Sequence, residues 1–591
     1  MKPSASALAL SWLAILLSVS VGILGRGYWT PDEPREADIA WRMSWQADKA
    51  VPLLAGDAFC EKPPLTYWIA GAAIGAGGTA AWIARLPNLL YALITALAVG
   101  CLGRRSGGAI AGWAAGAAIS TMLLSYQVAI WLATDAPLLA AVAVALLGLH
   151  AGFYATSSGA RFRGYSGMHA ALALGFLCKS AAAWMVPALT FCALAVWERR
   201  LRELLRWELY AGLLLQAAII LPWVWFVYAG PDGVAHLKVF FWNNLVGRFA
   251  AVDAPQELQY AGAHRNSPGK YLRELPVYLW PWTLLVLAAV RRAWRQRRDP
   301  ADVRRPVRFA LATFVPTLAV LSVAATARNI YLAPALPGIA LLLGWWIVQP
   351  AINHDAWDRR ALLATSWLLL IATGVLAFVV GIVGRDSWDT LEARQSYIGI
   401  CMLGLSAGAA LAMTAWRASR AARVLPAGFA LLLAYCALLT GPAAELYRRV
   451  DTWQDLASIG RAIALDAHER PLILFAADET TRAFIDMYSS PTAWFVAGPI
   501  DLESLARLRQ RLRQEPRSLV VSQLPGRRDS RTLHELAVWI GLEHHVPMVP
   551  SDDARAPPWA VDAKLHIEHT YSLPNGRRYA LLGTQTLGDS R

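Results

Sequence analysis

Two short charged segments follow the first hydrophobic stretch of this chain. Residues 30–38 read TPDEPREAD, and residues 61–64 read EKPP before hydrophobic sequence resumes. Together they hold five acidic and two basic side chains within a short reach of apolar sequence. Charge beside hydrocarbon is costly unless it binds something polar there. The pattern therefore predicts a charged active-site loop on a membrane protein, with a lipid that carries a charged head group as the expected ligand.

Asp32 and Glu33 are the carboxylates best placed for acid–base chemistry. At a membrane surface, Asp32 could act as a general base on an acceptor hydroxyl or phosphate, while Glu33 positions Arg35 or a metal ion. The alternative is an ion-paired loop end in which these acids pair with Arg35 and Arg42. The density of charge favours the functional interpretation, because charges that flank helices ordinarily extend outward without gathering in this way.

Lys62 lies where an extended Pro-Pro segment meets hydrophobic sequence. Its point charge could bind a lipid phosphate at head-group depth, although a lysine there also commonly extends to the interface without binding anything. Glu61 could orient Lys62 or ligate a metal ion, and His264, in a later loop expected on the same side, could supply a second ligand. Two ligands so distant in sequence are a weak signal for zinc or magnesium.

Further polar residues interrupt later hydrophobic stretches. Asp135 begins one of them, where it could also serve only as a helix cap ahead of Pro137. Lys179 separates two apolar segments. In another hairpin, Tyr331 could donate a hydrogen bond to an oxyanion while Arg328 pairs with it, although tyrosine is common at membrane interfaces.

The composition sets the class of protein. Of 591 residues, 56% are hydrophobic and only 16% are charged, which excludes one large soluble domain. The net charge of +14 arises mostly in the loops between apolar stretches, so it reports topology and not nucleic-acid binding. Six cysteines, without metal-ligand spacing, form no disulfide framework. We expect a polytopic α-helical membrane protein that has membrane lipids, and no nucleic acid, as partners.

Apolar runs long enough to cross a bilayer recur up to about residue 441. We predict about thirteen transmembrane helices, at residues 6–25, 83–102, 108–126, 134–154, 168–178, 181–197, 208–228, 276–291, 307–325, 330–348, 360–384, 396–415 and 422–442. Lys and Arg then gather repeatedly in the loops on the side of the N-terminus, which the positive-inside rule makes cytoplasmic. The loops at 26–82, 127–133, 229–275 and 385–395 and the tail lie on the other side.

Two segments test this count. Pro63 to Gly78 is apolar but only sixteen residues long, and a crossing there would reverse every later loop, so we predict an interfacial helix with Tyr67 and Trp68 at the head groups. The segment 168–178 is too short to span comfortably, so it must begin earlier or tilt.

The tail, residues 443–591, is predicted to form a soluble α/β domain. Short apolar runs at 471–475, 518–522 and 578–582 indicate strands, and 480–487 and 502–512 indicate helices. It shows no Gly-rich phosphate loop and no nucleophile elbow, so no nucleotide cofactor is expected.

Several motifs taken in order resemble those of the bacterial aminoarabinose (L-Ara4N) lipid A transferases, relatives of the protein O-mannosyltransferases with the GT-C fold. The matching pieces are Asp32-Glu33-Pro34-Arg35, residues 61–68 (EKPPLTYW), residues 84–87 (ARLP), residues 134–137 (TDAP), Cys178-Lys179-Ser180, Arg248-Phe249 with His264 downstream, and residues 328–334 (RNIYLAP).

The resemblance implies a multi-pass glycosyltransferase of the bacterial inner membrane. Residues 1–442 would form the GT-C transmembrane domain, with 26–82 as a periplasmic catalytic loop, and 443–591 would form a periplasmic α/β domain. The donor would be a sugar on undecaprenyl phosphate, and the acceptor lipid A or another glycolipid. Because the leaving group is already a stable anion, the site needs cations on the phosphate more than a general acid, and we expect a single inverting displacement.

The resemblance also implies roles for single residues. Asp32 is the expected catalytic carboxylate, supported by Glu33 and Asp135. Glu61 and His264 match a possible divalent metal site. Glu36 departs from the family, which has tyrosine at this position. The donor phosphate would be held by Lys62, Arg35, Tyr331, Arg328, Lys179 and Arg248.

Three alternatives stay open. A related enzyme could transfer a hexose or mannose to another glycan or to a protein. A lipid transporter or flippase would also be polytopic, but it should carry ionisable residues near the centres of its spans. A membrane sensor would need neither Asp32 nor Lys62.

Overall fold

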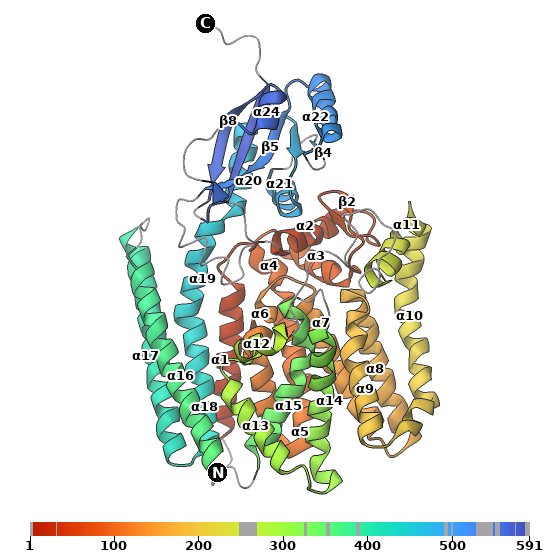
Figure 1. The fold of residues 1–591 in the computed structure, drawn as a ribbon, viewed down its shortest axis with the longest axis vertical. Helices are drawn as coiled ribbons and strands as arrows, with labels where there is room; N and C mark the ends of the chain where they lie inside the picture. Colours follow the sequence, from red (N-terminus) through yellow and green to blue (C-terminus); the bar gives the residue numbers. More distant parts are fainter. Residues whose placement is uncertain are drawn as a thin grey trace.

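The protein is described from a computed structural model, which covers residues 4–30, 32–246, 269–323, 328–349, 355–385, 390–489, 494–497, 500–527, 548–549, 556–573 and 575–584. Long helices stand side by side as a bundle, and a smaller sheet domain lies beyond one end of it (Figure 1). Helix α1 begins at the end of the bundle that faces away from the sheet domain (Figure 1). The predicted fold class is therefore confirmed.

The bundle consists of mainly apolar helices, most of which have no side-chain cap at their N-terminus. Its long members are α1 (Ala5–Ile23), α5 (Pro87–Thr121), α7 (Asp135–Phe153), α8 (Ser158–Lys179), α9 (Ala182–Trp197), α10 (Trp207–Ala229), α13 (Thr283–Arg295), α14 (Ala301–Val323), α15 (Leu336–Ile347), α16 (Ala356–Val383), α17 (Leu391–Arg420) and α18 (Val424–Leu438). Within the described residues, nine helical stretches are long and apolar enough to cross a membrane, and the exact count of thirteen stays a prediction.

The helix α5 is two arms joined at a sharp bend. Gly107 and Gly108 leave the helical conformation there, and the φ of Gly108 is 78°, which favours glycine. The arms then pack closely, since a Cβ on Gly112 would lie 2.6 Å from the carbonyl oxygen of Gly100. The bend accounts for two of the predicted spans, 83–102 and 108–126.

Two predicted spans have different bounds in the structure. The segment 276–291 is not one helix, because α12 (Lys270–Tyr278) ends in a turn and α13 begins only at Thr283. Pro281 lies in that turn, where it removes a backbone donor. The short span 168–178 belongs to α8, which begins at Ser158, so the expectation of an earlier start is confirmed.

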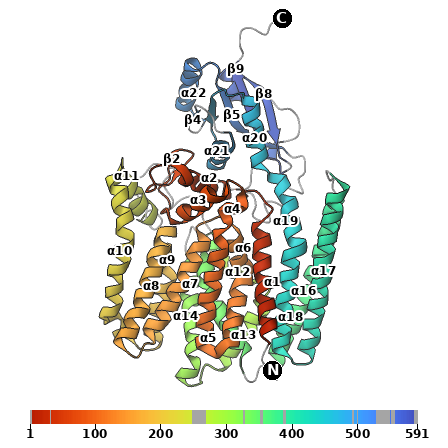
Figure 2. The same ribbon diagram turned by 180° about the vertical axis from the view of Figure 1, so that it is seen from behind.

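A layer of short elements, here called the cap layer (residues 32–85), lies across one end of the bundle, between the helices and the sheet domain (Figures 1 and 2). It contains α2 (Asp32–Trp45), β1 (Leu53–Leu54), β2 (Asp57–Ala58), α3 (Leu65–Gly77) and α4 (Ala81–Arg85). The transverse course of α3 agrees with the interfacial helix predicted for residues 63–78 (Figure 1).

The main sheet of this domain has, in the described residues, five strands in the order β4-β3-β5-β9-β8, and β6 (Gly526–Arg527) pairs separately with β7 (Met548–Val549). The five strands are β3 (Leu472–Phe475), β4 (Trp494–Ala497), β5 (Leu519–Leu524), β8 (Leu565–Ser572) and β9 (Arg578–Thr584). The pairs of β3 with β4 and β5 are parallel, whereas β9 pairs antiparallel with β5 and β8. A bulge between Ile567 and His569 interrupts the edge strand β8.

Helices α20 (Leu456–Ala467), α21 (Glu479–Ser489), α22 (Leu502–Gln514) and α24 (Pro558–Asp562) accompany the sheet. The predicted strands and helices of the tail all match elements of the structure. The chain does not leave the helical bundle at once after residue 442, because η6 (Leu439–Ala443) and α19 (Ala444–Asp451) prolong α18 toward the sheet domain. The division at 442/443 therefore stays a prediction.

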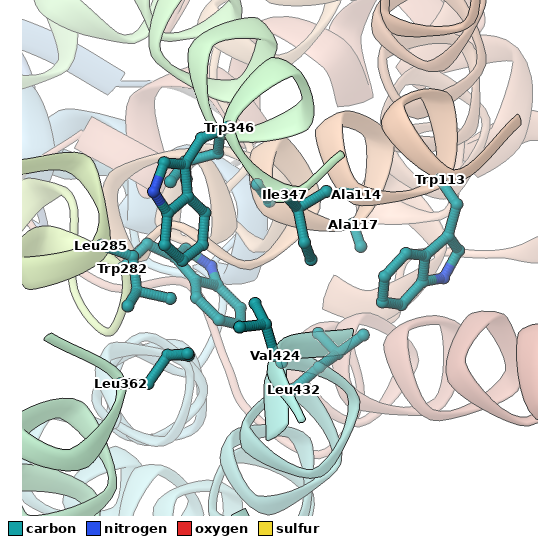
Figure 3. A pocket seen from close by; sticks show the side chains of 13 residues that line it. Trp113, Ala114, Ala117, Trp282, Leu285, Trp346, Ile347, Leu362, Val424 and Leu432 are labelled. Carbon is teal, nitrogen blue, oxygen red and sulfur yellow. The ribbon is translucent and has the colours of Figure 1, made fainter. Parts of the chain in front are cut away.

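Trp113, Trp282 and Trp346 line a small apolar cavity between α5, α13, α15, α16 and α18 (Figure 3). Its volume of about 40 Å³ leaves room for a water molecule or two, not for a sugar or lipid. None of the predicted site residues lines it. We interpret it as a gap in the packing of the bundle.

Candidate active site

Asp32 begins α2, at the inner edge of the cap layer, and Arg328 comes just before η5 (Asn329–Ala335). Arg328 Nη1 donates to Asp32 Oδ1 at 3.2 Å, and Nη2 donates to Oδ2. Burial alone would raise the pKa of Asp32, but Arg328, Lys62 and Arg35 together hold it below its usual range. Asp32 is therefore ionised at neutral pH, as a carboxylate that accepts a hydrogen bond from a hydroxyl must be.

Asp135 and Lys179 form a second ion pair in the same neighbourhood. Lys179 Nζ lies 2.6 Å from Asp135 Oδ1, because α7 begins where the neighbouring helix α8 ends. The Lys179 ammonium also lies 5.1 Å from the centre of the Tyr331 ring. Asp135 thus forms an ion pair with Lys179. Thr134 occupies the N-cap position of α7, but its side chain makes no capping hydrogen bond.

Arg328 connects these two pairs electrostatically. Its pKa is raised because the charge of Asp32, together with Tyr331 and Asp135, outweighs the cost of burial. The structure thus brings together five residues that the sequence predicted separately, from the starts of α2 and α7, the end of α8 and the segment before α15. These residues are Asp32, Asp135, Lys179, Arg328 and Tyr331.

Lys62 and Arg35 lie beside this group in the cap layer. Lys62 Nζ donates to Glu36 Oε1, and burial, which would lower the pKa of Lys62, is outweighed by Glu36, so the pKa is raised. Arg35 Nη2 lies 2.7 Å from Glu479 Oε2 of the sheet domain and 4.0 Å from Glu61 Oε2. Glu36, the departure from the family pattern, is therefore the counter-ion of the lysine expected to bind phosphate.

Glu33, unlike its neighbour Asp32, is fully buried. Its fully buried carboxylate accepts from Arg26 Nη1 at 2.7 Å and from Arg85 Nε at 2.8 Å. The backbone N–H groups of Trp29 and Leu132 donate to it at 2.9 and 2.8 Å. Burial would raise the pKa of Glu33, but Arg26 and Arg85 lower it to about 2.

These contacts, here called the Glu33 clamp (Arg26, Glu33 and Arg85), tie the start of α2 to the loop before α7. Arg26 Nη2 also donates to the carbonyl of Ile130 at 2.7 Å. Because Asp32 precedes Glu33 and Asp135 follows Leu132 by three residues, the clamp fixes the two candidate catalytic carboxylates relative to each other. The geometry favours a positioning role for Glu33 over direct contact with substrate.

The predicted metal site lies partly outside the described residues. His264 and Arg248 both fall on undescribed positions, and Glu61 lies within ion-pair range of Arg35. Among the residues that the structure describes, no group of three or more histidine, cysteine or acidic side chains could hold a metal ion. Zinc or magnesium at Glu61 and His264 stays a prediction.

Sequence reasoning missed three kinds of contact. The suggested pairing of the loop acids with Arg35 and Arg42 is present only at 3.8–4.0 Å, and Arg42 Nε makes a shorter contact with Asp486 Oδ2 of the sheet domain, at 2.6 Å. Arg26 was not singled out, and Arg85 appeared only within the motif at residues 84–87, where no local signal connects either arginine with Glu33. Glu479 lies more than 400 residues from Arg35, so no spacing could indicate that pair.

An apolar hollow adjoins the cap layer. It has a volume of about 670 Å³ and runs between α3, the end of α8 and α10. Trp68, Leu177, Trp223 and Phe226 are among its lining residues, and the charged residues in its described lining are Asp48 and Lys49. A hollow of this size accommodates part of a lipid tail.

Comparison with known proteins identifies glycosyltransferases as relatives of this chain. A family model described as dolichyl-phosphate-mannose-protein mannosyltransferase matches residues 61–226. The undecaprenyl phosphate-alpha-4-amino-4-deoxy-L-arabinose arabinosyl transferase of Pseudomonas paraeruginosa is 28% identical over 432 residues, which cover 69% of this chain and 71% of that protein. The enzyme of the same name from Pectobacterium carotovorum is 29% identical over 430 residues, with 69% and 71% covered.

Among solved structures, the crystal structure of ArnT from Cupriavidus metallidurans bound to undecaprenyl phosphate matches with a TM-score of 0.71. The identity is 17%, and 98% of each chain is covered, so the likeness establishes a shared fold over almost the whole length. The sequence relatives and this fold agree with each other and with the ordered motifs. The chain therefore has the fold of this ArnT structure and is similar in sequence to these arabinosyl transferases and to the mannosyltransferase family model.

Proposed function

We propose that this protein transfers a sugar from undecaprenyl phosphate to lipid A or a related glycolipid, with 4-amino-4-deoxy-L-arabinose as the sugar. The names of the sequence relatives support this substrate pair. The observation that carries the proposal is the cluster at the end of the bundle, where Asp32 and Asp135 are paired with Arg328 and Lys179, with Lys62 and Arg35 beside them.

The arrangement supports one inverting displacement at the anomeric carbon. The phosphate of the carrier would exchange for Glu36 at Lys62 and would approach the Arg35 guanidinium beside it, so that the leaving anion stays neutralised as the bond to the sugar breaks. Asp32 would accept the proton or hydrogen bond of the attacking group on the acceptor. Lys179 would hold Asp135 and leave Tyr331 beside the oxyanion. The isoprenoid chain would extend into the hollow near Trp68 and Trp223.

A runner-up proposal is transfer of a hexose or mannose to another glycan or to a protein, and the description of the matching family model supports it. A lipid transporter is disfavoured, because the charged cluster lies at the starts of α2 and α7 and at the end of α8, and not at the middle of the helices.

Lipid analysis tests the substrate pair directly. We expect lipid A from bacteria that lack their own transferase to gain the mass of aminoarabinose when this chain is expressed and the undecaprenyl-linked donor is present. Mass spectrometry of lipid A and of total glycans should be compared with cells that carry an empty vector. A hexose on another glycan, with lipid A unchanged, would favour the runner-up; no new glycoconjugate at all would contradict both.

We further propose that the protein lies in the bacterial inner membrane with the cap layer and the sheet domain in the periplasm. The motive is the repeated excess of Lys and Arg in the loops on the side of the N-terminus. A reporter that is active only in the cytoplasm should be active when it is fused after Arg105. A reporter that is active only in the periplasm should be active when it is fused after Arg449. Periplasmic activity at Arg105 would overturn both the orientation and the thirteen-span topology.

A further inference from the structure

The sheet domain contacts the candidate site through α21. On this helix Glu479, Arg482 and Asp486 recur at a spacing of three and four residues, which places them on one face. On α2, Arg35 and Arg42 are seven residues apart and likewise share a face. Glu479 pairs with Arg35, Asp486 with Arg42, and Arg482 with Asp57 of β2. Charged pairs thus fix the register of α21 on the cap layer.

One end of this interface is buried around two carboxylates. The Asp38 and Asp486 carboxyl groups are close neighbours, and Arg42 forms an ion pair with each of them. The backbone N–H of Ala55 donates to Asp38 Oδ2 at 2.6 Å. Burial and the charge of Asp486 raise the pKa of Asp38 well above its usual range. This end of the interface holds the sheet domain in place. It does not reach the candidate site, because Asp38 and Arg42 lie further along α2 than Asp32, which begins the helix.

The other end reaches the site itself. Arg35 Nη2 lies 2.7 Å from Glu479 Oε2, whereas the distances from Arg35 to Asp32 Oδ1 and Glu61 Oε2 are both 4.0 Å. Of the four acids that raise the pKa of Arg35, Glu479 has the largest effect. Asp32 and Arg35 are three residues apart on α2, a spacing at which two side chains can pair closely. Their ion pair is long, whereas the pair of Arg35 with Glu479 is short.

From this geometry we propose that Glu479 of the sheet domain is a positioning residue of the donor site. It holds the Arg35 guanidinium away from Asp32 and Glu61, so that Arg35 can meet the carrier phosphate and Asp32 keeps its charge for the acceptor. The proposal deepens the function proposed above and rests on it. It also gives the sheet domain a role, because the donor site is incomplete without α21.

Binding of undecaprenyl phosphate tests this role. The full-length protein in lipid nanodiscs should be titrated with undecaprenyl phosphate by calorimetry, as wild type and as the variant Glu479→Gln. We expect the variant to bind about three- to fivefold more weakly, the scale of a partly exposed ion pair. Glu479→Asp should recover part of the loss, because it restores the charge on a shorter side chain.

Three controls make the outcome decisive. Asp57→Asn removes the Arg482 pair of the same interface and should leave binding unchanged. Lys62→Ala removes the proposed phosphate contact and should weaken binding about tenfold or more. Adding Glu479→Gln to Arg35→Gln should have no further effect if Glu479 acts through Arg35.

Each contrary result is distinguishable. Equal losses from Asp57→Asn and Glu479→Gln would mean that the docking of α21 matters and not the placement of Arg35. Unchanged or tighter binding by Glu479→Gln would likewise overturn the proposal, the latter by making Glu479 a competitor of the phosphate. If the wild type binds no undecaprenyl phosphate, the proposed function fails, and this inference falls with it.

Discussion

Replacing Asp32 by asparagine should reduce sugar transfer by about a hundredfold or more, the usual scale for a lost general base. Asparagine keeps the shape of the side chain but cannot take up a proton. The pKa of Asp32 is held below its usual range, so its charge is present throughout the neutral range and protonation of Asp32 cannot account for any loss of activity near pH 6. Protein abundance and donor binding should survive the change.

The measurement is the initial rate of transfer from undecaprenyl-linked sugar to lipid A in reconstituted membranes. Asp135→Asn is the matched comparison, because that carboxylate is also paired with a cation at the same end of the bundle. We expect a smaller loss from it. If Asp32→Asn turned over at the wild-type rate while Asp135→Asn were inactive, the role of base would pass to Asp135.

Glu33→Gln should affect folding more than chemistry. The substitution leaves Arg26 and Arg85 buried beside each other without the carboxylate that both contact. Breaking a buried ion pair by removing one partner costs about 3–5 kcal/mol, because a charge remains uncompensated. We expect a clear fall in the thermal unfolding temperature of the purified protein and a lower yield from membranes.

The exposed Glu503 of α22 provides the control, because Glu503→Gln removes the same charge at the surface and should change the unfolding temperature little. Adding Arg85→Met to Glu33→Gln should restore part of the lost stability by removing one of the two facing cations. A Glu33→Gln protein as stable as the wild type would show that the Glu33 clamp does not support the fold.

Much of the architecture could be predicted because hydrophobicity alone specifies it. Apolar runs defined the spans, and the basic loops decided that residues 63–78 should lie along the membrane surface, as α3 does across the bundle end. The error in the span 276–291 arose because the turn that separates α12 from α13 does not interrupt the apolar sequence. The first turns of α8 could not be delimited for the opposite reason, because they carry Arg161 and Arg163 and no apolar run.

The site was harder to predict than the fold. Side chains such as Asp32, Lys62 and Asp135 could be found one by one, because charge next to apolar sequence is unusual. The pairing of these side chains with Arg328 and Lys179 could not be predicted, because it depends on how the helices pack against each other. Glu33 shows the limit most clearly: its neighbour in sequence, Asp32, has the same charge and the same local surroundings, yet Glu33 is fully enclosed by Arg26 and Arg85.

The edge strand β8 affects whether neighbouring copies of the protein in one membrane can pair through their sheets. Proteins confined to a plane meet their own copies far more often than proteins free in solution, and an open sheet edge held at a constant height above that plane invites strand-to-strand stacking. The bulge between Ile567 and His569 interrupts that edge, and Glu568 at the bulge carries a charge that pairs with Arg470. A broken and charged edge of this kind lets many copies lie side by side without joining their sheets.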